Sequence, residues 1–151
     1  MDADKREYPM NNLTEFLWEQ WHPEAKVIAN SLKELLAKES CQFPENGKLM
    51  NVSKTQGVYI IRKNRTVLHV GRTYGGREGL HQRLKNHLNG ASSFVIKYLK
   101  RNKEKLRKKG YTYQLLRVRG DKKRAYLENL ATGILHPEYI GTGRKKQHTA
   151  D

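Results

Sequence analysis

The chain has 151 residues, enough for one domain, and its charged fraction of 30% leaves room for only a small hydrophobic core. Its formal net charge is +15, and its single cysteine, Cys41, excludes a disulfide framework. No apolar run approaches the length needed to span a membrane, and residues 1–10 lack the apolar core of a signal peptide. We therefore expect a protein inside the cell, cytoplasmic or associated with the nucleoid, with no membrane partner.

The basic charge is concentrated in the last two thirds of the chain. Residues 1–50 carry 6 Lys+Arg and 9 Asp+Glu, a net charge of −3, whereas residues 51–151 carry 24 and 6, a net charge of +18. A field of this sign favours a polyanion, most simply a nucleic acid bound through its phosphates. A solubilising basic surface would give the same charge. A basic membrane-surface helix is less favoured because the cations are spread over several elements.

Residues 1–54 are predicted to form a helical extension followed by a connector at residues 41–54. Two helices are expected, the second opened by Pro23. Their apolar stripes suit a core or a contact between two copies of the chain, so a homodimer through the N-terminal helices is one hypothesis. The two stripes are Leu13, Phe16, Leu17 and Trp21, then Val27, Ile28, Leu32, Leu35 and Leu36.

A β-hairpin is predicted where the basic part begins. Residues 57–62 and 67–71 have the composition of strands and are joined by a polar turn. Because alternate side chains of a strand share a face, Tyr59 points away from its neighbour Val58. The hairpin sets the two strands side by side, so Tyr59 and His69 are expected to lie close enough to share a site.

A glycine-rich loop at residues 73–79 and a helix at residues 80–88 follow. The loop lacks the Gly-Lys-Ser/Thr ending of a P-loop, so a plain flexible connection explains its glycines best. At about 100° per residue, Arg83 and His87 lie beside the leucine stripe of the helix rather than on its solvent face. A phosphate-facing role for this pair is favoured at least as much as a snorkelling arginine and a half-buried histidine.

The remaining chain predicts a helix, a strand and a second helix. Ser92 or Ser93 caps a helix that ends at Gly110, and residues 111–118 form the third strand. Asp121 caps the last helix, which continues to about Leu135 with Leu127, Leu130, Ala131 and Ile134 on its core side.

Glu128 is the only carboxylate between Lys122 and Pro137. An ordinary ion pair with Arg124, four residues earlier, and a functional carboxylate are equally good explanations of it. Residues 141–151 form a basic tail.

Several basic residues near these elements are predicted to contact nucleic acid. The segment from Lys100 to Lys109 is densely basic, and it is either a solvated helix face or a surface that follows a phosphate backbone. The predicted contacts are Arg72, Arg77, Lys85, Lys97, Lys100 and Arg101.

The order of four features resembles the GIY-YIG nuclease superfamily. They are Gly57-Val58-Tyr59, His69-Val70-Gly71, a helical Arg83, and Glu128 nine residues before Pro137. The resemblance covers about residues 56–140. It implies an α+β fold in which a small three-stranded antiparallel sheet is flanked by helices, forming a nuclease domain at residues 55–140. It also implies a DNA endonuclease that hydrolyses a phosphodiester.

The resemblance assigns roles by position. Tyr59 would activate the water, Arg83 would contact the scissile phosphate, and Glu128 would bind a divalent metal. His69 stands where the family has its second motif tyrosine, and His87 occupies a position at which some restriction and homing members also have histidine. A further departure is Ile140, where many members have an asparagine.

The chemistry of these residues agrees with one metal ion. A single carboxylate supports one Mg²⁺ (or Mn²⁺), with water and phosphate oxygens completing the shell, and argues against a two-metal site. The cation and Arg83 would lower the pKa of the Tyr59 phenol, which is otherwise a poor base. The alternative is a basic nucleic-acid-binding module on the same fold without strong catalysis, which His69 and Ile140 favour. A structural RNA-associated protein is a third hypothesis.

Overall fold

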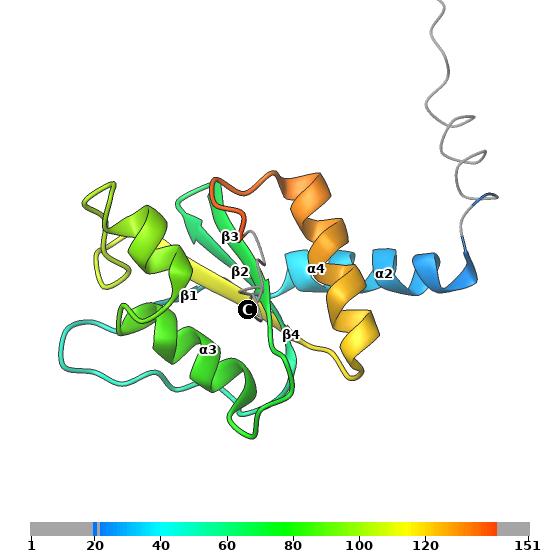
Figure 1. Cartoon of the computed structure of the whole chain (residues 1–151), viewed down its shortest axis with the longest axis horizontal. Coiled ribbons are helices and arrows are strands. Elements are labelled where there is room, and N and C mark those ends of the chain that lie inside the picture. Colours follow the sequence, from blue (N-terminus) through cyan, green and yellow to red (C-terminus); the bar gives the residue numbers. More distant parts are fainter. Residues whose placement is uncertain (1–19, 21, 142–151) are drawn as a thin grey trace, which may run out of the picture.

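The structure is a computed structural model that describes residues 20 and 22–141. A four-stranded antiparallel sheet, ordered β1-β4-β2-β3, lies between helices (Figure 1). The α+β class is therefore confirmed, whereas the prediction of three strands is wrong. The predicted helix around Leu13 to Trp21 lies outside the described residues. The elements are α2 (Pro23–Ala37), β1 (Cys41–Gln42), β2 (Gly57–Lys63), β3 (Thr66–Arg72), α3 (Gly79–Leu88), the π-helix η1 (Val95–Leu99), β4 (Tyr111–Arg117) and α4 (Asp121–Leu135).

The fourth strand, β1, comes from the segment that was predicted to be only a connector. Cys41 pairs with Tyr113 and Gln42 with Thr112, so β1 forms the edge of the sheet beside β4. The next residue, Phe43, is buried and packs edge-on against Tyr113 with ring centroids 4.9 Å apart. A strand of two residues is too short to show the alternation by which strands are recognised in a sequence.

The predicted hairpin is confirmed as β2 and β3. Asn64 and Arg65 form the turn, and Asn64 adopts the left-handed conformation (φ 52°) that tight hairpin turns require. The register pairs Tyr59 with Gly71 and, two residues on, Ile61 with His69. Tyr59 and Ile61 belong to one buried cluster, and Val58 and Ile60 belong to another, as alternation predicts.

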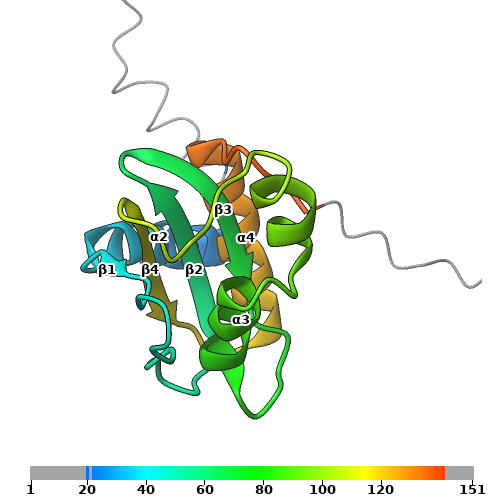
Figure 2. The same ribbon diagram turned by 90° about the vertical axis from the view of Figure 1, so that its left-hand side faces the viewer.

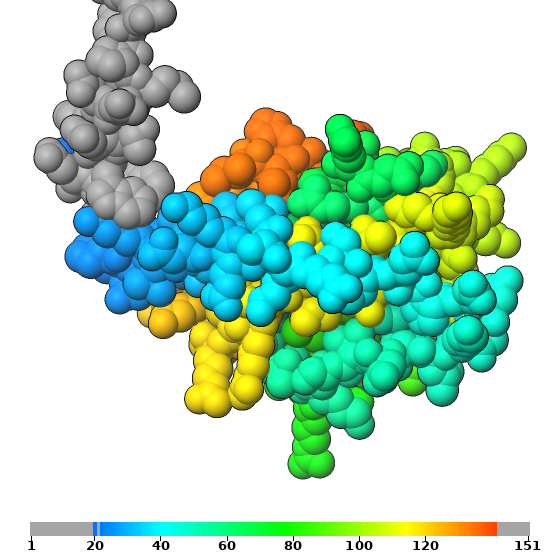
Figure 3. Space-filling model, turned by 180° about the vertical axis from the view of Figure 1, so that it is seen from behind, coloured from blue at the N-terminus to red at the C-terminus, as the bar shows by residue number. Residues whose placement is uncertain are grey.

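The two clusters lie on opposite faces of the sheet. α3 and the segment that contains η1 cover one face, and α2 and α4 cover the other (Figure 2). α2 supplies Ile28, Leu32 and Leu35 to the second cluster, whereas Val27 and Leu36 of its predicted stripe are exposed. From behind, α2 and the segment that follows it run across the surface of the molecule (Figure 3).

Close approach of other atoms leaves no room for a side chain at two glycines of the hairpin. A Cβ at Gly71 would overlap the hydroxyl and ring of Tyr59, which lies on the paired strand. A Cβ at Gly57 would overlap the carbonyl oxygen of Leu116. Both glycines of the motif are thus required by packing around Tyr59 and β4, independently of any reaction.

The predicted helix from Ser92 to Lys109 is too long. Ser92 accepts a hydrogen bond from the Val95 amide, as a cap should, but the helical segment ends with η1 at Leu99. The ten residues after Leu99 carry seven Lys or Arg and only one acid, Glu104. Like charges one helical turn apart destabilise a helix, which explains why this segment forms turns instead.

α4 is confirmed with small corrections. Gly120 occupies the cap position, so Asp121 is the first helical residue rather than the cap. Leu127 and Ala131 are buried as predicted, but Ile134 is 58% exposed. In the part of the chain that the structure describes, no helix is long and apolar enough to cross a membrane.

Candidate active site

A polar cavity of about 470 Å³ lies along the β3 edge of the sheet, with α3 and the η1 segment on one side and α4 on the other. His69, Arg83, His87 and Glu128, four of the five predicted catalytic residues, line it. Tyr59 does not: its side chain is fully buried directly behind the wall that the two histidines form. A second groove, of about 630 Å³ between α2 and α4, is mainly apolar and contains none of the five.

Tyr59 is the first member of a hydrogen-bonded chain. Its hydroxyl lies 2.6 Å from Nε2 of His87, and Nδ1 of His87 lies 2.6 Å from the Ser92 hydroxyl. That hydroxyl oxygen also accepts the amide hydrogen bond of Val95, at 3.2 Å. If His87 carries its proton on Nδ1 and donates it to Ser92, Nε2 is free to accept the phenol proton of Tyr59.

Burial sets the protonation of this chain. It raises the pKa of the Tyr59 phenol to about 12, although the neighbouring Arg83 guanidinium opposes the rise. Burial, helped by the positive charges that His69 and Arg83 can carry, holds the pKa of His87 well below its ordinary value. Near neutral pH the pair is therefore a neutral phenol bonded to a neutral imidazole.

His69 lies beside this pair. Its ring stacks on Phe94 (centroids 4.8 Å apart, 12° between planes) and is 6.0 Å from the Tyr59 ring and 5.4 Å from the His87 ring. Burial lowers the pKa of His69 to about 4, so this imidazole is also neutral near pH 7. With this pKa the imidazole is a weak base near pH 7, and its ring nitrogens serve as one hydrogen-bond donor and one acceptor.

Arg83 and Glu128 bring unsatisfied polar atoms to the cavity. Nε of Arg83 and Oε2 of Glu128 are buried and have no hydrogen-bond partner in the structure. Leaving such groups unpaired costs about 1–3 kcal/mol each, more when they are charged. An unused donor and an unused carboxylate oxygen in one polar cavity suit a ligand that brings both anionic oxygens and a cation.

The partner of Glu128 is Arg72 and not Arg124. Nε of Arg72 is 3.6 Å from Oε2 of Glu128. Arg124 is 4% exposed and points elsewhere, donating to the carbonyls of Thr73 (3.2 Å) and Val118 (3.0 Å) and pairing with Asp121. The Arg124–Glu128 pair that the sequence left open is therefore not formed. Burial raises the pKa of Glu128, and the two nearby guanidinium groups, those of Arg72 and Arg83, oppose the rise.

The donor set around Glu128 fits one hard cation held loosely by the protein. No cluster of three or more His, Cys, Asp or Glu side chains suited to a metal occurs among the described residues. The unpaired Oε2 of Glu128 supplies one carboxylate oxygen. Mg²⁺ is commonly bound through one or two carboxylates together with water and phosphate oxygens, so this arrangement suits it.

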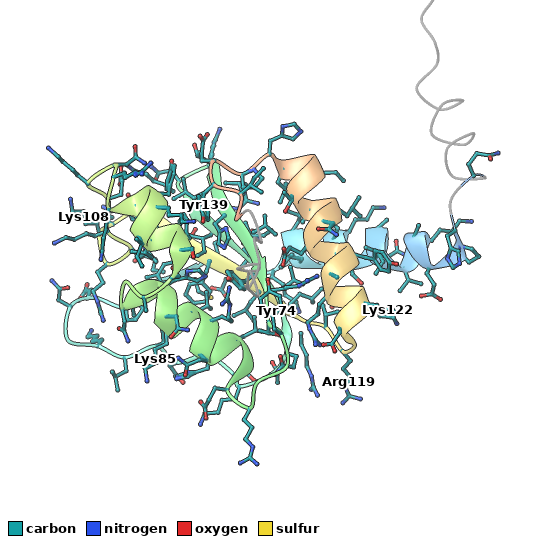
Figure 4. All side chains as sticks on the ribbon, viewed as in Figure 1. Tyr74, Lys85, Lys108, Arg119, Lys122 and Tyr139 are labelled. Carbon is teal, nitrogen blue, oxygen red and sulfur yellow. The ribbon has the colours of Figure 1, made fainter. Side chains whose placement is uncertain are left out.

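The predicted nucleic-acid contacts fall into two groups. Lys97 lines the cavity and Arg72 pairs with Glu128 in its wall. The other four are exposed and do not line the cavity: Arg77, Lys85, Lys100 and Arg101. Figure 4 shows Lys85 on α3 and, on the other side of Tyr74, Lys122 in the first turn of α4 with Arg119 just before that helix. Exposed positive charge thus occurs on both helices that border the cavity.

Two tyrosines of the site were missed from the sequence. Tyr139 was given no role from the sequence, but its amide donates to the Leu68 carbonyl (2.9 Å) and its ring lies 5.6 Å from that of His69. Tyr74, 67% exposed, has the guanidinium carbons of Arg72 and Arg83 at 5.0 Å and 5.5 Å from its ring centroid. Tyr74 lies between α3 and α4, whereas Tyr139 lies beside the η1 segment (Figure 4). An aromatic residue in a glycine-rich loop was the only sequence signal for Tyr74.

Comparison with known proteins adds no assignment. The chain matches no family model, no curated protein and no solved structure. The geometry of the cavity is therefore the basis on which function is argued.

Proposed function

We propose that the chain is a DNA endonuclease of the GIY-YIG type that hydrolyses a phosphodiester with the help of one divalent metal ion. The observation that carries the proposal is the convergence of His69, Arg83, His87 and Glu128 on one cavity, with Tyr59 bonded to His87 behind it. These residues come from β2, β3, α3 and α4, and they lie in a part of the chain with a net charge of +18.

Arg83 and its neighbours bind the phosphate. The unpaired Nε–H of Arg83 donates to a phosphate oxygen, which removes the penalty of leaving that donor buried and unused. Lys97 reaches the same cavity and adds a second cation. Exposed cations elsewhere on α3 and α4 bind the neighbouring phosphates, which gives affinity without reading sequence.

Tyr59 and His87 move the proton of the attacking water. In the free protein the phenol keeps its proton, because the pKa of Tyr59 is raised and that of His87 is lowered. A phosphate on Arg83 would raise the pKa of His87, and neutralisation of Glu128 would lower that of Tyr59. The phenol proton can then pass to Nε2 of His87, 2.6 Å away, and the phenolate takes a proton from the water. The water oxygen forms a bond to phosphorus as the bond from phosphorus to the leaving sugar oxygen breaks. The leaving oxygen takes a proton from solvent. Tyr59 releases the proton of the attacking water to solvent and recovers its own proton from His87, which resets the site, and Ser92 keeps the imidazole oriented through Nδ1.

Glu128 holds the metal ion. When bound, Mg²⁺ or Mn²⁺ acts as a Lewis acid on the phosphate oxygens. The Glu128 carboxylate contributes to the raised pKa of Tyr59, so neutralising that carboxylate makes the phenol a stronger acid. Glu128 therefore has two roles. It would bind the cation, and the loss of its negative charge on binding would lower the pKa of Tyr59.

One observation favours a second candidate function, a nucleic-acid-binding module without strong catalysis. Tyr59 has no exposed surface and its pKa is about 12, so its hydroxyl must become accessible and lose a proton before it can act. Such a module would bind DNA through the same cations.

Nicking of supercoiled plasmid distinguishes the two functions. The nuclease predicts conversion to open circles with Mg²⁺, none with EDTA, and at least about 100-fold slower nicking by Glu128→Ala. Glu104→Ala is the matched control, because it removes a carboxylate that pairs with Lys63, and neither residue lines the cavity. A wild-type protein that binds DNA and never nicks it would support the binding module. Undiminished nicking by Glu128→Ala would remove the metal-ligand role.

A further inference from the structure

We propose that Arg72 occupies the metal ligand Glu128 in the free protein, so that the divalent cation and DNA bind cooperatively and the metal site is weak until a phosphate arrives. The inference rests on the proposed function only in taking Glu128 as the metal ligand. Arg72 is the last residue of β3, and its Nε lies 3.6 Å from Oε2 of Glu128. Both side chains are largely shielded, at 24% and 23% exposed.

The atom that Arg72 approaches is the one a cation would use. Oε2 of Glu128 is buried and lacks a hydrogen bond, so only the charges of Arg72, at 3.6 Å, and of Arg83 compensate it. A distance of 3.6 Å is a charge contact without a hydrogen bond. Such a contact can be exchanged for a cation without breaking a directed bond.

The charge balance around this oxygen disfavours a metal ion by itself. Arg83 and Lys97 line the cavity and Arg72 adjoins it, whereas Glu128 is the one carboxylate among the described residues that line it. A divalent cation added to this surplus of positive charge is repelled. A DNA phosphate on Arg83 and Lys97 reverses the balance and supplies oxygen ligands. By linkage, each ligand must then strengthen the binding of the other by the same factor.

Arg72 can stay in contact with the Tyr74 ring when a cation binds Glu128. The guanidinium carbon of Arg72 is already 5.0 Å from the centroid of the Tyr74 ring. A cation over an aromatic face is attracted to it, so Arg72 keeps this interaction after it releases the carboxylate. The exchange therefore needs only a small movement at the end of β3.

The test measures Mn²⁺ binding to the full chain without DNA. The concentration of free Mn²⁺ is determined from its electron paramagnetic resonance signal. The informative variant is Arg72→Gln, which removes the charge, and Arg72→Lys keeps it. Arg65→Gln is the matched control. It removes the same charge in the turn between β2 and β3, at the other end of the hairpin from Arg72. Glu128→Ala shows whether the ion is bound at Glu128, and circular dichroism checks that each variant is folded.

The expected result is that Arg72→Gln binds Mn²⁺ about tenfold more tightly than wild type, while Arg72→Lys and Arg65→Gln change the affinity by less than about twofold. Adding Glu128→Ala to Arg72→Gln should abolish the tightened site. An Arg72→Gln variant that binds Mn²⁺ no better than wild type would overturn the proposal. These outcomes do not depend on cleavage, so a protein that shows them but never nicks DNA would refute the nuclease function alone.

The second arm measures the coupling with DNA. In the Tyr59→Phe background, with the duplex shown intact on a gel, the affinity for a short duplex is measured by fluorescence anisotropy with and without Mn²⁺. We expect Mn²⁺ to tighten DNA binding about tenfold or more in the otherwise wild-type chain, and by a smaller factor with Arg72→Gln. An equal effect of Mn²⁺ in both proteins would contradict the role of Arg72.

Discussion

Replacing Gly71 by alanine tests the placement of Tyr59, on which the proton path depends. The added methyl group would overlap the Tyr59 hydroxyl and ring, which have no room to retreat because Tyr59 is fully buried. Overpacking of a core typically costs about 1–3 kcal/mol. Breaking the bond from Tyr59 to His87 adds about 1 kcal/mol, so we expect Gly71→Ala to lower the free energy of unfolding by about 2–4 kcal/mol.

Urea denaturation at neutral pH measures this loss, and Gly133→Ala is the matched control. Gly133 lies in α4, and a Cβ built there has no neighbour within 4 Å. Alanine stabilises an exposed helix position over glycine by about 0.5–1 kcal/mol, so this control should shift in the opposite direction. A Gly71→Ala protein as stable as wild type would refute the close packing of Tyr59 on β3. Unchanged DNA nicking by a destabilised Gly71→Ala would show that the phenol is not needed in this position.

Three further predictions concern the chemistry and the charge of the site. His87→Phe removes the acceptor of the Tyr59 proton, so nicking should fall by about 100-fold or more at matched DNA occupancy, measured under single turnover. Burial lowers the pKa of His69 from 6.5 to about 4, so between these values the unfolded chain binds a proton that the folded chain does not. The free energy of unfolding should therefore fall by up to about 3 kcal/mol as pH drops through this window. Urea denaturation at both ends of it should show a smaller loss for His69→Phe, and an unchanged loss would contradict the burial argument. Lys97→Gln should reduce the slope of log affinity for DNA against log salt by about 1 in a binding titration, whereas Lys33→Gln on α2 should leave it unchanged.

The hairpin and the last helix could be predicted because their patterns are local. Alternation along β2 placed Tyr59 and Val58 on opposite faces, and the two buried clusters confirm this. The apolar spacing of Leu127 and Ala131 likewise identified the buried side of α4. The reason for Gly71 could not be found in this way, because it depends on the ring of Tyr59 across the strand pair.

The parts that the sequence did not reveal depend on distant contacts. Arg124 was considered only as a neighbour of Glu128 on a helix, whereas its main partners are the carbonyls of Thr73 and Val118. Tyr139 enters the cavity wall because the chain after α4 returns to β3 and its amide bonds to Leu68. Neither contact leaves a periodic signal, so neither could be derived from spacing.

The exchange of a carboxylate for an amide at Glu128 tests the central claim most directly. The Glu128→Gln side chain has almost the same shape but a weak affinity for hard cations. The rate at which this variant nicks a duplex with saturating Mg²⁺ is compared with the wild-type rate, under single turnover and at equal DNA occupancy. The account predicts that wild type cuts the duplex and that Glu128→Gln cuts it at least about 100-fold more slowly. Equal rates, or a wild-type protein that binds the duplex and leaves it intact, would contradict the account.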